Sequence, residues 1–471
     1  MLNPASEQFE TSLRAALPEA CFRPLEPRYL EEPRGRFRAR DALLLTPGST
    51  AEVSEILRQA NAARVAVIPY GGGTGLVGGQ VGVGLERPVL LSLERMNTVR
   101  SVHPAENLLI AEGGVILSNV HAAADAAGRI FPLSLASEGS AQIGGLLGTN
   151  AGGVNMLRYG NARELCLGIE AVLADGSVMH GLKRLRKDNT GYDLRNLLIG
   201  SEGTLGVITA ACLRLFSQPA SRGTTAMVVR SPRDALTLLS QVQGRLGEGI
   251  SAFELIHRTG LEFLAEVMPQ VRLPFAQAPE WMVLLEIGLS GGLDADTALE
   301  QIFVEAAEAG VVLDGVMTSS DAQRDALWQM RESIPEANRL IGAITSHDIS
   351  VPIETIPDFI PQAWERVQAI GPFRVNCFGH LGDGNLHFNT YPPKGEDRDR
   401  YSDWRVDISR QVHDLVQEYG GSVSAEHGIG RLKVGDLERY GDPGKLAAMR
   451  AIKTALDPAG ILNPGVVLRA G

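Results

Sequence analysis

Apolar residues in the first 217 positions recur at two spacings, and each spacing predicts a different kind of element. Ser49 and Glu52 form a capping box, and the apolar residues at positions 53, 56, 57 and 60 keep the spacing of one helix face. The uninterrupted apolar run at 65–68 predicts a buried strand. Asp175-Gly176 separates two strand-like segments and predicts a hairpin. This half of the chain therefore mixes helices with strands.

From about residue 218 onward, longer helical patterns alternate with strand-like runs. The helical patterns occupy residues 232–244, 295–309, 321–341, 354–369 and 402–419. The strand-like runs include residues 281–287, 311–316, 348–351 and 375–378. This order of strand and helix predicts a sheet with helices packed on one face.

The chain is too long for one hydrophobic core, and changes in its hydrophobic pattern and composition suggest where it divides into domains. With 471 residues, two or three domains are expected. Residues 1–37 are predicted to form a helix and an irregular arm, because Pro and Arg are frequent near their end. Residues 38–217 and 218–424 are predicted as two domains. Residues 425–471 form the remaining segment, and the turn-rich stretch near the C-terminal end is too apolar for a disordered tail.

The composition narrows the possible classes of protein. A net charge of −11 argues against nucleic-acid and anionic-membrane partners, so a site for an acid needs locally placed cations. Four cysteines are scattered without a CxxC pair, which argues against iron–sulfur and zinc-ribbon sites and predicts reduced thiols. No signal-peptide pattern and no run of roughly 18 apolar residues is found. We therefore expect a soluble, cytoplasmic protein.

The first chemical signal is a glycine-rich loop at residues 69–79, directly after the predicted buried strand. Such a loop lets backbone N–H groups converge on phosphate oxygens. It contains one G-x-G-x-x-G pattern, Gly73 to Gly78, which imitates the fingerprint of a nicotinamide enzyme. That fingerprint must open a helix, and the glycines and Pro88 that follow exclude one. A nicotinamide dehydrogenase is therefore the disfavoured alternative.

Two further segments strengthen the prediction of a large ligand. Residues 132–153 are dominated by small and hydroxyl-bearing side chains, which suits backbone laid against a large flat molecule. Residues 200–208 repeat this glycine-rich character and lead into a strand. The alternative, a ligand-free surface loop at 69–79, becomes much less favoured with three such segments.

Together, the three segments resemble the FAD-binding domain of the vanillyl-alcohol oxidase and p-cresol methylhydroxylase superfamily over residues 38–217. The resemblance implies an α+β fold with a two-subdomain FAD-binding domain and a cap domain whose largely antiparallel sheet is covered by helices. FAD is expected to be non-covalent, because residues 69–79 and 132–153 lack His and Cys. The implied FAD-binding residues are Tyr70, Gly71, Gly72, Gly73, Thr74, Gly75, Leu76, Pro132, Leu133, Gly139, Ser140, Gly144, Gly145, Thr149, Asn150, Gly152, Gly153, Glu202, Gly203, Gly206, Val207, Ile208 and Asn463.

Two short glycine-flanked segments, 379–389 and 424–430, carry three of the nine histidines. Two imidazoles and a carboxylate with open positions suit a catalytic divalent metal. His380 and His387 would face opposite sides of one flat strand, so the turn at 382–384 must bring them together. Ordinary core or surface histidines are the alternative, and metallohydrolase chemistry fits this trio equally well. The flavin loops favour redox chemistry.

Both segments resemble the D-2-hydroxyacid dehydrogenase branch, which includes D-lactate, glycolate and D-2-hydroxyglutarate dehydrogenases. The resemblance extends over nearly the whole chain. It implies that His380, His387 and Glu426 bind the metal, with zinc expected, and that His427 is the base. Arg331 and Asn389 would bind the substrate. Residues 425–471 would complete the active site and pack back on the FAD domain.

Two positions depart from the pattern of the family. Pro335 and Ser346 stand where a hydroxyl and a cation often help to hold a distal carboxylate. Their absence favours a D-lactate-like or larger apolar hydroxy acid over a dicarboxylate. For Arg331, the alternative is a surface ion pair on an exposed helix face.

The mechanistic hypothesis is the metal-assisted oxidation of a D-2-hydroxy acid to the 2-oxo acid. His427 removes the hydroxyl proton, which the metal makes more acidic, and hydride passes to flavin N5. By resemblance, an electron-transfer flavoprotein or a quinone is the expected electron acceptor, and a homodimer the expected assembly. The alternatives are an electron-relay flavoprotein subunit and an ether-lipid synthase of the same fold.

Overall fold

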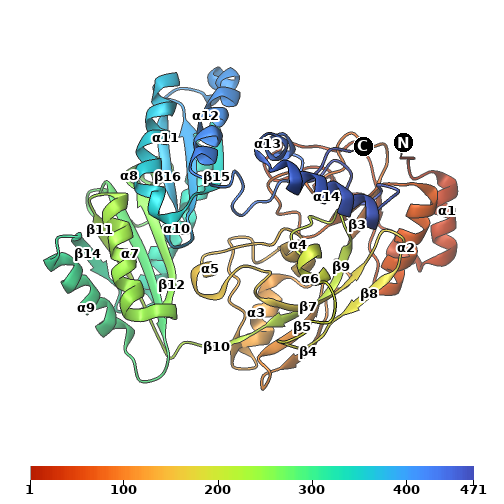
Figure 1. The fold of residues 1–471 in the computed structure, drawn as a ribbon, viewed down its shortest axis with the longest axis horizontal. Helices are drawn as coiled ribbons and strands as arrows, with labels where there is room; N and C mark the ends of the chain where they lie inside the picture. The colour runs from red at the N-terminus through yellow and green to blue at the C-terminus, as the bar shows by residue number, and fades with distance from the viewer. Residues whose placement is uncertain (1, 471) are drawn as a thin grey trace. The chain divides into compact units, whose positions relative to one another are not determined.

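The computed structural model describes residues 2–470, which divide into two compact units (Figure 1). The first unit comprises the chain up to Gly153, Gly160–Gln218 and the chain from Glu426 onward. The second comprises Val154–Tyr159 and Pro219–Ala425. Among the described residues, no helix is both long enough and apolar enough to cross a membrane.

The first unit contains a parallel and an antiparallel sheet. The parallel sheet has the order β1 (Leu43–Leu45), β3 (Val89–Ser92) and β2 (Val67–Tyr70). The antiparallel sheet has the order β4 (Val99–His103), β5 (Leu108–Glu112), β9 (Val207–Arg214), β7 (Cys166–Val172) and β8 (Val178–Gly181). A short pair joins β10 (Phe216–Ser217) to β6 (Arg129–Ile130). The predicted hairpin at Asp175-Gly176 is confirmed, because β7 and β8 pair around it.

The first unit also contains several α-helices. They are α1 (Glu7–Ala16), α2 (Thr50–Ala63), α3 (Leu117–Asp125), α4 (Ile143–Gly148), α6 (Leu194–Leu198), α13 (Val434–Tyr440) and α14 (Pro443–Leu456). The capping box is confirmed at α2: Ser49 Oγ accepts from the Glu52 N–H, and the Glu52 carboxylate accepts from the Gly48 N–H. The described residues 71–87 contain no helix, which removes the structural basis for a nicotinamide fingerprint.

The C-terminal end is integrated into the first unit. Ile461 and Leu462 are fully buried in the core formed by α1, α2 and the parallel sheet. The Val67 N–H donates to the Ile461 carbonyl, and the Asn463 N–H donates to the Val67 carbonyl, so the chain runs alongside β2. This region is therefore ordered core, as its apolar composition predicts.

The second unit is built on a seven-stranded antiparallel sheet within the described residues. Its order is β14 (Val312–Met317), β11 (Ser221–Val229), β13 (Trp281–Leu289), β12 (Ile250–His257), β16 (Arg374–His380), β17 (Asn385–Tyr391) and β15 (Thr345–Ser350). Together with the sheets of the first unit, this confirms the α+β prediction and the largely antiparallel cap sheet.

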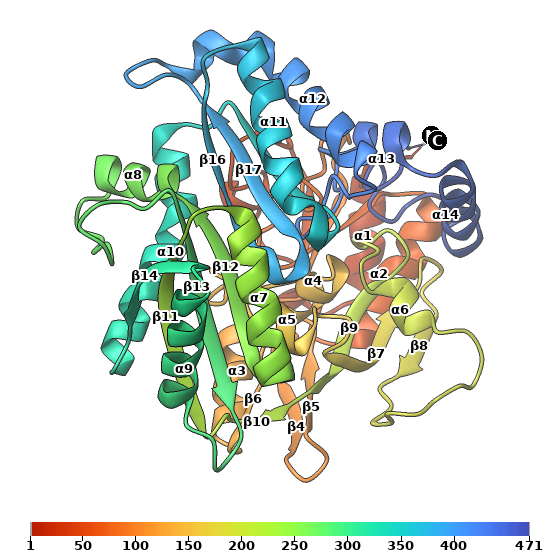
Figure 2. The same ribbon diagram turned by 60° about the vertical axis from the view of Figure 1, so that its left-hand side comes forward.

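The prediction that helices pack on only one face of this sheet is wrong, because both faces are covered (Figure 2). One face packs against α7 (Pro232–Leu246), α9 (Ala295–Glu308), α11 (Ile356–Ile370) and α12 (Arg405–Glu418). The opposite face packs against α8 (Arg258–Val267) and α10 (Asp321–Ile341). The central strand β13 is apolar on both faces, so each face must be shielded from water.

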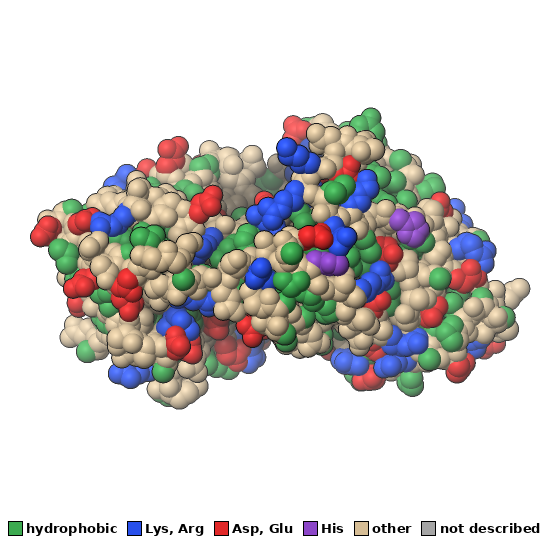
Figure 3. Space-filling model, turned by 90° about the horizontal axis from the view of Figure 1, so that it is seen from below, with side chains coloured by type: hydrophobic (Ala, Val, Ile, Leu, Met, Phe, Trp, Pro, Cys, Tyr) green, Lys and Arg blue, Asp and Glu red, His purple; other side chains and the backbone are tan. Residues whose placement is uncertain are grey.

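Short elements complete the two units. They are α5 (Met156–Tyr159) and the 3-10 turns η1 (Glu19–Cys21), η2 (Pro27–Tyr29), η3 (Gly247–Gly249), η4 (Ile353–Thr355), η5 (Leu381–Asp383) and η6 (Arg398–Trp404). On the surface drawn in Figure 3, acidic and basic side chains are interspersed. The net negative charge is thus not gathered into one patch on that face.

Candidate active site

The three glycine-rich segments of the first unit meet through close backbone contacts. A Cβ on Gly72 would lie 2.0 Å from the Ser140 carbonyl oxygen, so only glycine fits between the first and second segments. A Cβ on Gly144 would lie 3.0 Å from the Ile208 carbonyl oxygen, which joins the second segment to the third. The fold therefore brings together segments that are far apart in sequence.

The predicted FAD-binding residues all lie on or beside these meeting segments. Tyr70 ends β2, the residues from Gly71 to Leu76 form the loop after it, and Val207 and Ile208 begin β9. Gly144 and Gly145 lie in α4, which ends just before Thr149. The others lie in the adjoining turns, namely Pro132, Leu133, Gly139, Ser140, Asn150, Gly152, Gly153, Glu202, Gly203, Gly206 and Asn463.

These segments have the properties that a large ligand requires. A Cβ on Gly145 would meet only the backbone of Gly71, at 3.7 Å, so both loops present bare backbone. Gln142 Oε1 and Asn463 Oδ1 are buried oxygens without a hydrogen-bond partner among the described residues. Because buried acceptors are normally satisfied, a ligand with N–H or O–H donors is expected here. FAD has such donors on its ribityl chain and ring, so the residues present fit it.

Glu202 connects the third segment to the C-terminal region of the same unit. Its carboxylate accepts from the backbone N–H groups of Ile429 (2.7 Å) and Gly430 (2.8 Å). Burial raises the pKa of Glu202, although these two hydrogen bonds and Lys433 act in the opposite direction. The side chain thus fixes the segment that follows His427, a contact that the sequence did not indicate.

In the second unit, one tight hairpin brings both predicted histidine ligands to one site. β16 ends at His380, η5 spans Leu381–Asp383, and β17 begins at Asn385, so a single residue separates η5 from β17. Gly384 has a φ of 83°, a left-handed conformation that glycine adopts without strain. His387 pairs with Phe378 across the hairpin. The turn therefore solves the problem of the odd sequence separation, as the sequence analysis expected.

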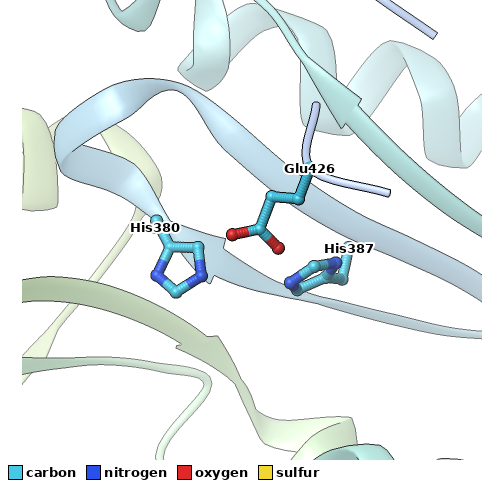
Figure 4. A group of neighbouring side chains, drawn as sticks. All are labelled: His380, His387 and Glu426. Atoms are coloured by element: carbon cyan, nitrogen blue, oxygen red, sulfur yellow. The ribbon is translucent and has the colours of Figure 1, made fainter. Parts of the chain in front are cut away.

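His380, His387 and Glu426 offer ligand atoms that all lie within 4.8 Å of one another (Figure 4). Glu426 follows Ala425, whose N–H donates to the Asp348 carbonyl in β15 (3.2 Å), so chain continuity carries the carboxylate to the hairpin. Two imidazoles and one carboxylate form a donor set that suits a divalent transition metal and leaves positions open for a ligand.

His427 belongs to a second group of neighbouring side chains. Ligand atoms of Asp348, Glu426 and His427 also lie within 4.8 Å of one another. Asp348 is buried in β15, directly opposite His387, and accepts from Asn385 Nδ2 (3.0 Å). No motif in the sequence indicates Asp348, although a carboxylate inside a strand-like run is a signal of a buried polar contact.

Arg331 is buried, which excludes the alternative of a surface ion pair. It projects from α10 with 5% of its surface exposed, and its Nε donates to Glu254 Oε2 (2.7 Å). Glu254 Oε1 forms a hydrogen bond with His380 Nδ1. Burial raises the pKa of Glu254, but Arg331 and His380 outweigh burial and lower the pKa to about 2. No motif in the sequence indicates Glu254.

Asn389 is oriented by the neighbouring strand. Its Oδ1 accepts from the backbone N–H of His347 (3.1 Å), so the amide NH₂ group points away from that strand. Pro335 and Ser346, the two departures from the family pattern, are both exposed. Pro335 lies inside α10, where its missing N–H leaves the Arg331 carbonyl without the usual helical donor.

Comparison with known families is consistent with this architecture. Residues 42–181 match the family described as "FAD binding domain". Residues 218–467 match the family described as "FAD linked oxidases, C-terminal domain". Solved structures share the fold: p-cresol methylhydroxylase has a TM-score of 0.76 at 15% identity, covering 100% of this chain and 99% of that one. An alkyldihydroxyacetonephosphate synthase has a TM-score of 0.73 at 17% identity, covering 98% and 86%.

Curated relatives are similar over almost the whole chain. A probable mitochondrial D-2-hydroxyglutarate dehydrogenase from Oryza sativa subsp. indica is 38% identical, over 92% of this chain and 76% of its own length. A D-2-hydroxyglutarate dehydrogenase from Stutzerimonas stutzeri is 36% identical, over 92% of both chains. The chain therefore belongs to the FAD-linked oxidases, in the branch of the D-2-hydroxyacid dehydrogenases.

Proposed function

We propose that this protein is an FAD-dependent, metal-assisted dehydrogenase that oxidises a D-2-hydroxy acid to the 2-oxo acid. The observation that carries the proposal is the convergence of His380, His387 and Glu426, with His427 next in the chain, in a member of the FAD-linked oxidases. An electron-relay subunit needs neither a metal-ligand set nor a base. The names of the curated relatives support the substrate class.

When bound, FAD would supply a two-electron acceptor, held non-covalently, and a divalent ion such as Zn²⁺ would supply a Lewis acid. The three glycine-rich segments would hold the FAD. His380, His387 and Glu426 would hold the ion. An electron-transfer flavoprotein or a quinone would take the electrons from the enzyme.

His427 is assigned the role of general base. It follows Glu426 in the chain and shares a group of neighbouring side chains with Glu426, one of the proposed metal ligands, and with Asp348. Asp348 in that group offers a carboxylate oxygen that can accept a hydrogen bond from one imidazole nitrogen. The other nitrogen then keeps its lone pair and can take the proton from the substrate's hydroxyl group.

Asn389 is assigned to the substrate's α-carboxylate, and Arg331 is assigned to a carboxylate of the substrate. A guanidinium group suits a carboxylate because it offers several parallel N–H donors. Glu254 accepts from one edge of Arg331, and the amide NH₂ of Asn389 points away from the strand that holds its oxygen. Both side chains lie within the second unit, as do the two histidine ligands.

The base assignment is tested by replacing His427 with Asn, with the exposed His180 replaced by Asn as the matched control. We expect kcat to fall by about 10²–10⁴-fold in H427N, with unchanged FAD content, because a general base contributes that much. H180N should retain wild-type kcat. A loss below about tenfold in H427N would remove His427 from this role.

The size of the substrate is tested with D-lactate and D-2-hydroxyglutarate side by side. The names of the relatives favour the dicarboxylate. Pro335 and Ser346 favour a substrate with an apolar tail, because neither supplies a cation for a distal carboxylate. We expect a higher kcat/KM for D-lactate than for D-2-hydroxyglutarate. If the P335T/S346K double variant reduces the difference between the two kcat/KM values, these positions determine the specificity. A strong preference of the unchanged enzyme for D-2-hydroxyglutarate would contradict it.

A further inference from the structure

Glu254 contacts both a proposed metal ligand, His380, and a proposed substrate-binding residue, Arg331. It occupies the middle of β12, is fully buried, and pairs across the sheet with His380 of β16. Its partners in sequence are remote, since His380 is 126 positions away and Arg331 is 77 positions away. A buried carboxylate in the middle of a sheet is costly unless it is paired. The two carboxylate oxygens here have separate partners.

The contact with His380 determines which of its nitrogens can bind a metal. A carboxylate only accepts hydrogen bonds, so the proton between Glu254 Oε1 and His380 lies on Nδ1. Nε2 of the neutral ring then keeps its lone pair, which a metal ligand requires. Hydrogen bonds of this kind commonly fix the tautomer and orientation of metal-binding histidines.

The contact with Glu254 also fixes the orientation of the Arg331 guanidinium group. Both Nε and one terminal nitrogen of Arg331 lie 2.7 Å from Glu254 Oε2. The guanidinium carbon also lies 5.0 Å above the centre of the Phe378 ring. These two contacts hold the plane of the guanidinium group, so the direction of its remaining N–H donors is set before a substrate arrives.

We propose that Glu254 is a positioning residue that holds the metal-binding face of His380 and the substrate-binding face of Arg331 through one carboxylate. This inference rests on the proposed function, because it assigns Glu254 to the same site. It adds a residue that no motif in the sequence indicates. It also explains why a charged side chain lies in a strand whose other residues are mostly apolar.

Glu254→Gln is the direct test, because it keeps the size of the side chain and removes one acceptor. The amide oxygen can still accept from one partner, but the amide NH₂ group must then face an N–H donor of the other. We expect the affinity for Zn²⁺ to fall by about 10–100-fold, the range found when such partners of metal ligands are removed. KM for the hydroxy acid should rise, because Arg331 is no longer held.

The matched control is Glu286→Gln. Glu286 lies in the neighbouring strand β13, where its carboxylate accepts from Trp328 and Thr224. It therefore tests the loss of a carboxylate from the same sheet without loss of the His380 and Arg331 contacts. We expect its affinity for Zn²⁺ to match that of the wild type.

The measurement is a titration of the chelator-treated, FAD-loaded proteins with buffered free Zn²⁺, read as bound metal. Weaker binding in E254Q but not in E286Q supports the inference, and equal binding in all three proteins overturns it. If the wild-type protein binds no Zn²⁺, the metal part of the proposed function fails, and this inference fails with it.

A second variant covers the case in which E254Q does not fold. Replacing Glu254 with Leu and Arg331 with Met removes both charges of the buried pair, a change that proteins often tolerate. The double variant E254L/R331M has no acceptor for His380 Nδ1 at this position. Reduced affinity for Zn²⁺ is therefore expected in it too, and wild-type affinity there would overturn the proposal.

Discussion

Two glutamates, the fully buried Glu254 and the half-buried Glu202, fix functional segments of the two units by different electrostatic means. Glu254 in the second unit has a guanidinium group and an imidazole as partners. Burial alone would raise its pKa, but Arg331 and His380 outweigh burial, and the pKa is lowered to about 2. This carboxylate is therefore charged in its buried position because its partners are cationic or can become so.

Glu202 in the first unit has backbone dipoles as its nearest partners. The N–H groups of Ile429 and Gly430 donate to its two oxygens, and Lys433 adds a weaker attraction. Burial dominates, and the pKa of Glu202 is raised. Two good hydrogen bonds thus satisfy this half-buried carboxylate geometrically without compensating the loss of water around its charge.

The largest effect is expected from breaking the charged pair. In Arg331→Met the Glu254 carboxylate keeps only His380, so a buried charge loses its main partner. We expect the free energy of unfolding to fall by about 3–5 kcal/mol, together with a large loss of kcat/KM. Urea unfolding of the metal-free protein measures the stability.

Arg339→Met is the control for this prediction. Arg339 lies on the same helix and pairs with Glu336, and both side chains are largely exposed. Exposed pairs contribute about 0–1 kcal/mol, so R339M should unfold almost as the wild type does. Equal destabilisation by the two variants would mean that the buried pair contributes no more to the free energy of unfolding than the exposed pair does.

A smaller effect, with a characteristic pH dependence, is expected from Glu202→Gln. Because the pKa of Glu202 is raised in the folded protein, its stabilising contribution is complete below the unfolded value near 4.5 and is lost as pH rises through the folded pKa. The amide of the E202Q variant cannot ionise, so this variant should not show the loss. The stability of the wild type relative to E202Q should therefore fall between acidic and neutral pH, by about 1.4 kcal/mol for each pH unit between the two pKa values.

Glu202→Ala separates the hydrogen bonds from the charge. It leaves the N–H groups of Ile429 and Gly430 without their acceptor, which costs about 1–3 kcal/mol for each buried donor. E202A should therefore be less stable than E202Q at neutral pH. If the stability of the wild type relative to E202Q instead rises with pH, the pKa of Glu202 is lowered and not raised in the folded protein.

The smallest effect concerns thiols whose pKa values are set chiefly by burial. The thiols of Cys21 and Cys212 have pKa values raised to about 11, chiefly by burial, and that of Cys166 is raised to about 12. Native protein at neutral pH should therefore react with an alkylating reagent far more slowly than urea-unfolded protein. Mass spectrometry measures the labelling, and rapid labelling of a native thiol would show that its surroundings open readily.

Much of the architecture could be predicted from the sequence, because long helices and apolar strands carry clear periodicity. The helical patterns at 295–309 and 321–341 correspond to α9 and α10 almost residue for residue. The strands β12 and β17 were not predicted. Their polar residues, such as Glu254 and His387, interrupt the apolar pattern at the positions that form the site. The apolar pattern therefore fails to predict strands at the positions where the proposed site requires polar residues.

The candidate site could be predicted only where its residues cluster in sequence. His380, His387, Glu426 and His427 lie in two short segments, and the turn at Gly384 was expected. Glu254 and Asp348 were missed, because pairing between distant strands leaves no local signal. The one available hint was a charged residue within a strand-like run, which in a buried sheet implies a partner.

The central claim is that this chain oxidises a D-2-hydroxy acid through FAD at a metal-dependent site. The most direct test mixes purified, Zn²⁺-loaded protein anaerobically with D- and L-2-hydroxy acids and follows the absorbance of the oxidised flavin. Rapid bleaching by a D-acid but not by its L-enantiomer, abolished by a chelator and restored by Zn²⁺, is the predicted result. Bleaching that survives verified removal of the metal, or a flavin that no hydroxy acid reduces, would contradict the claim.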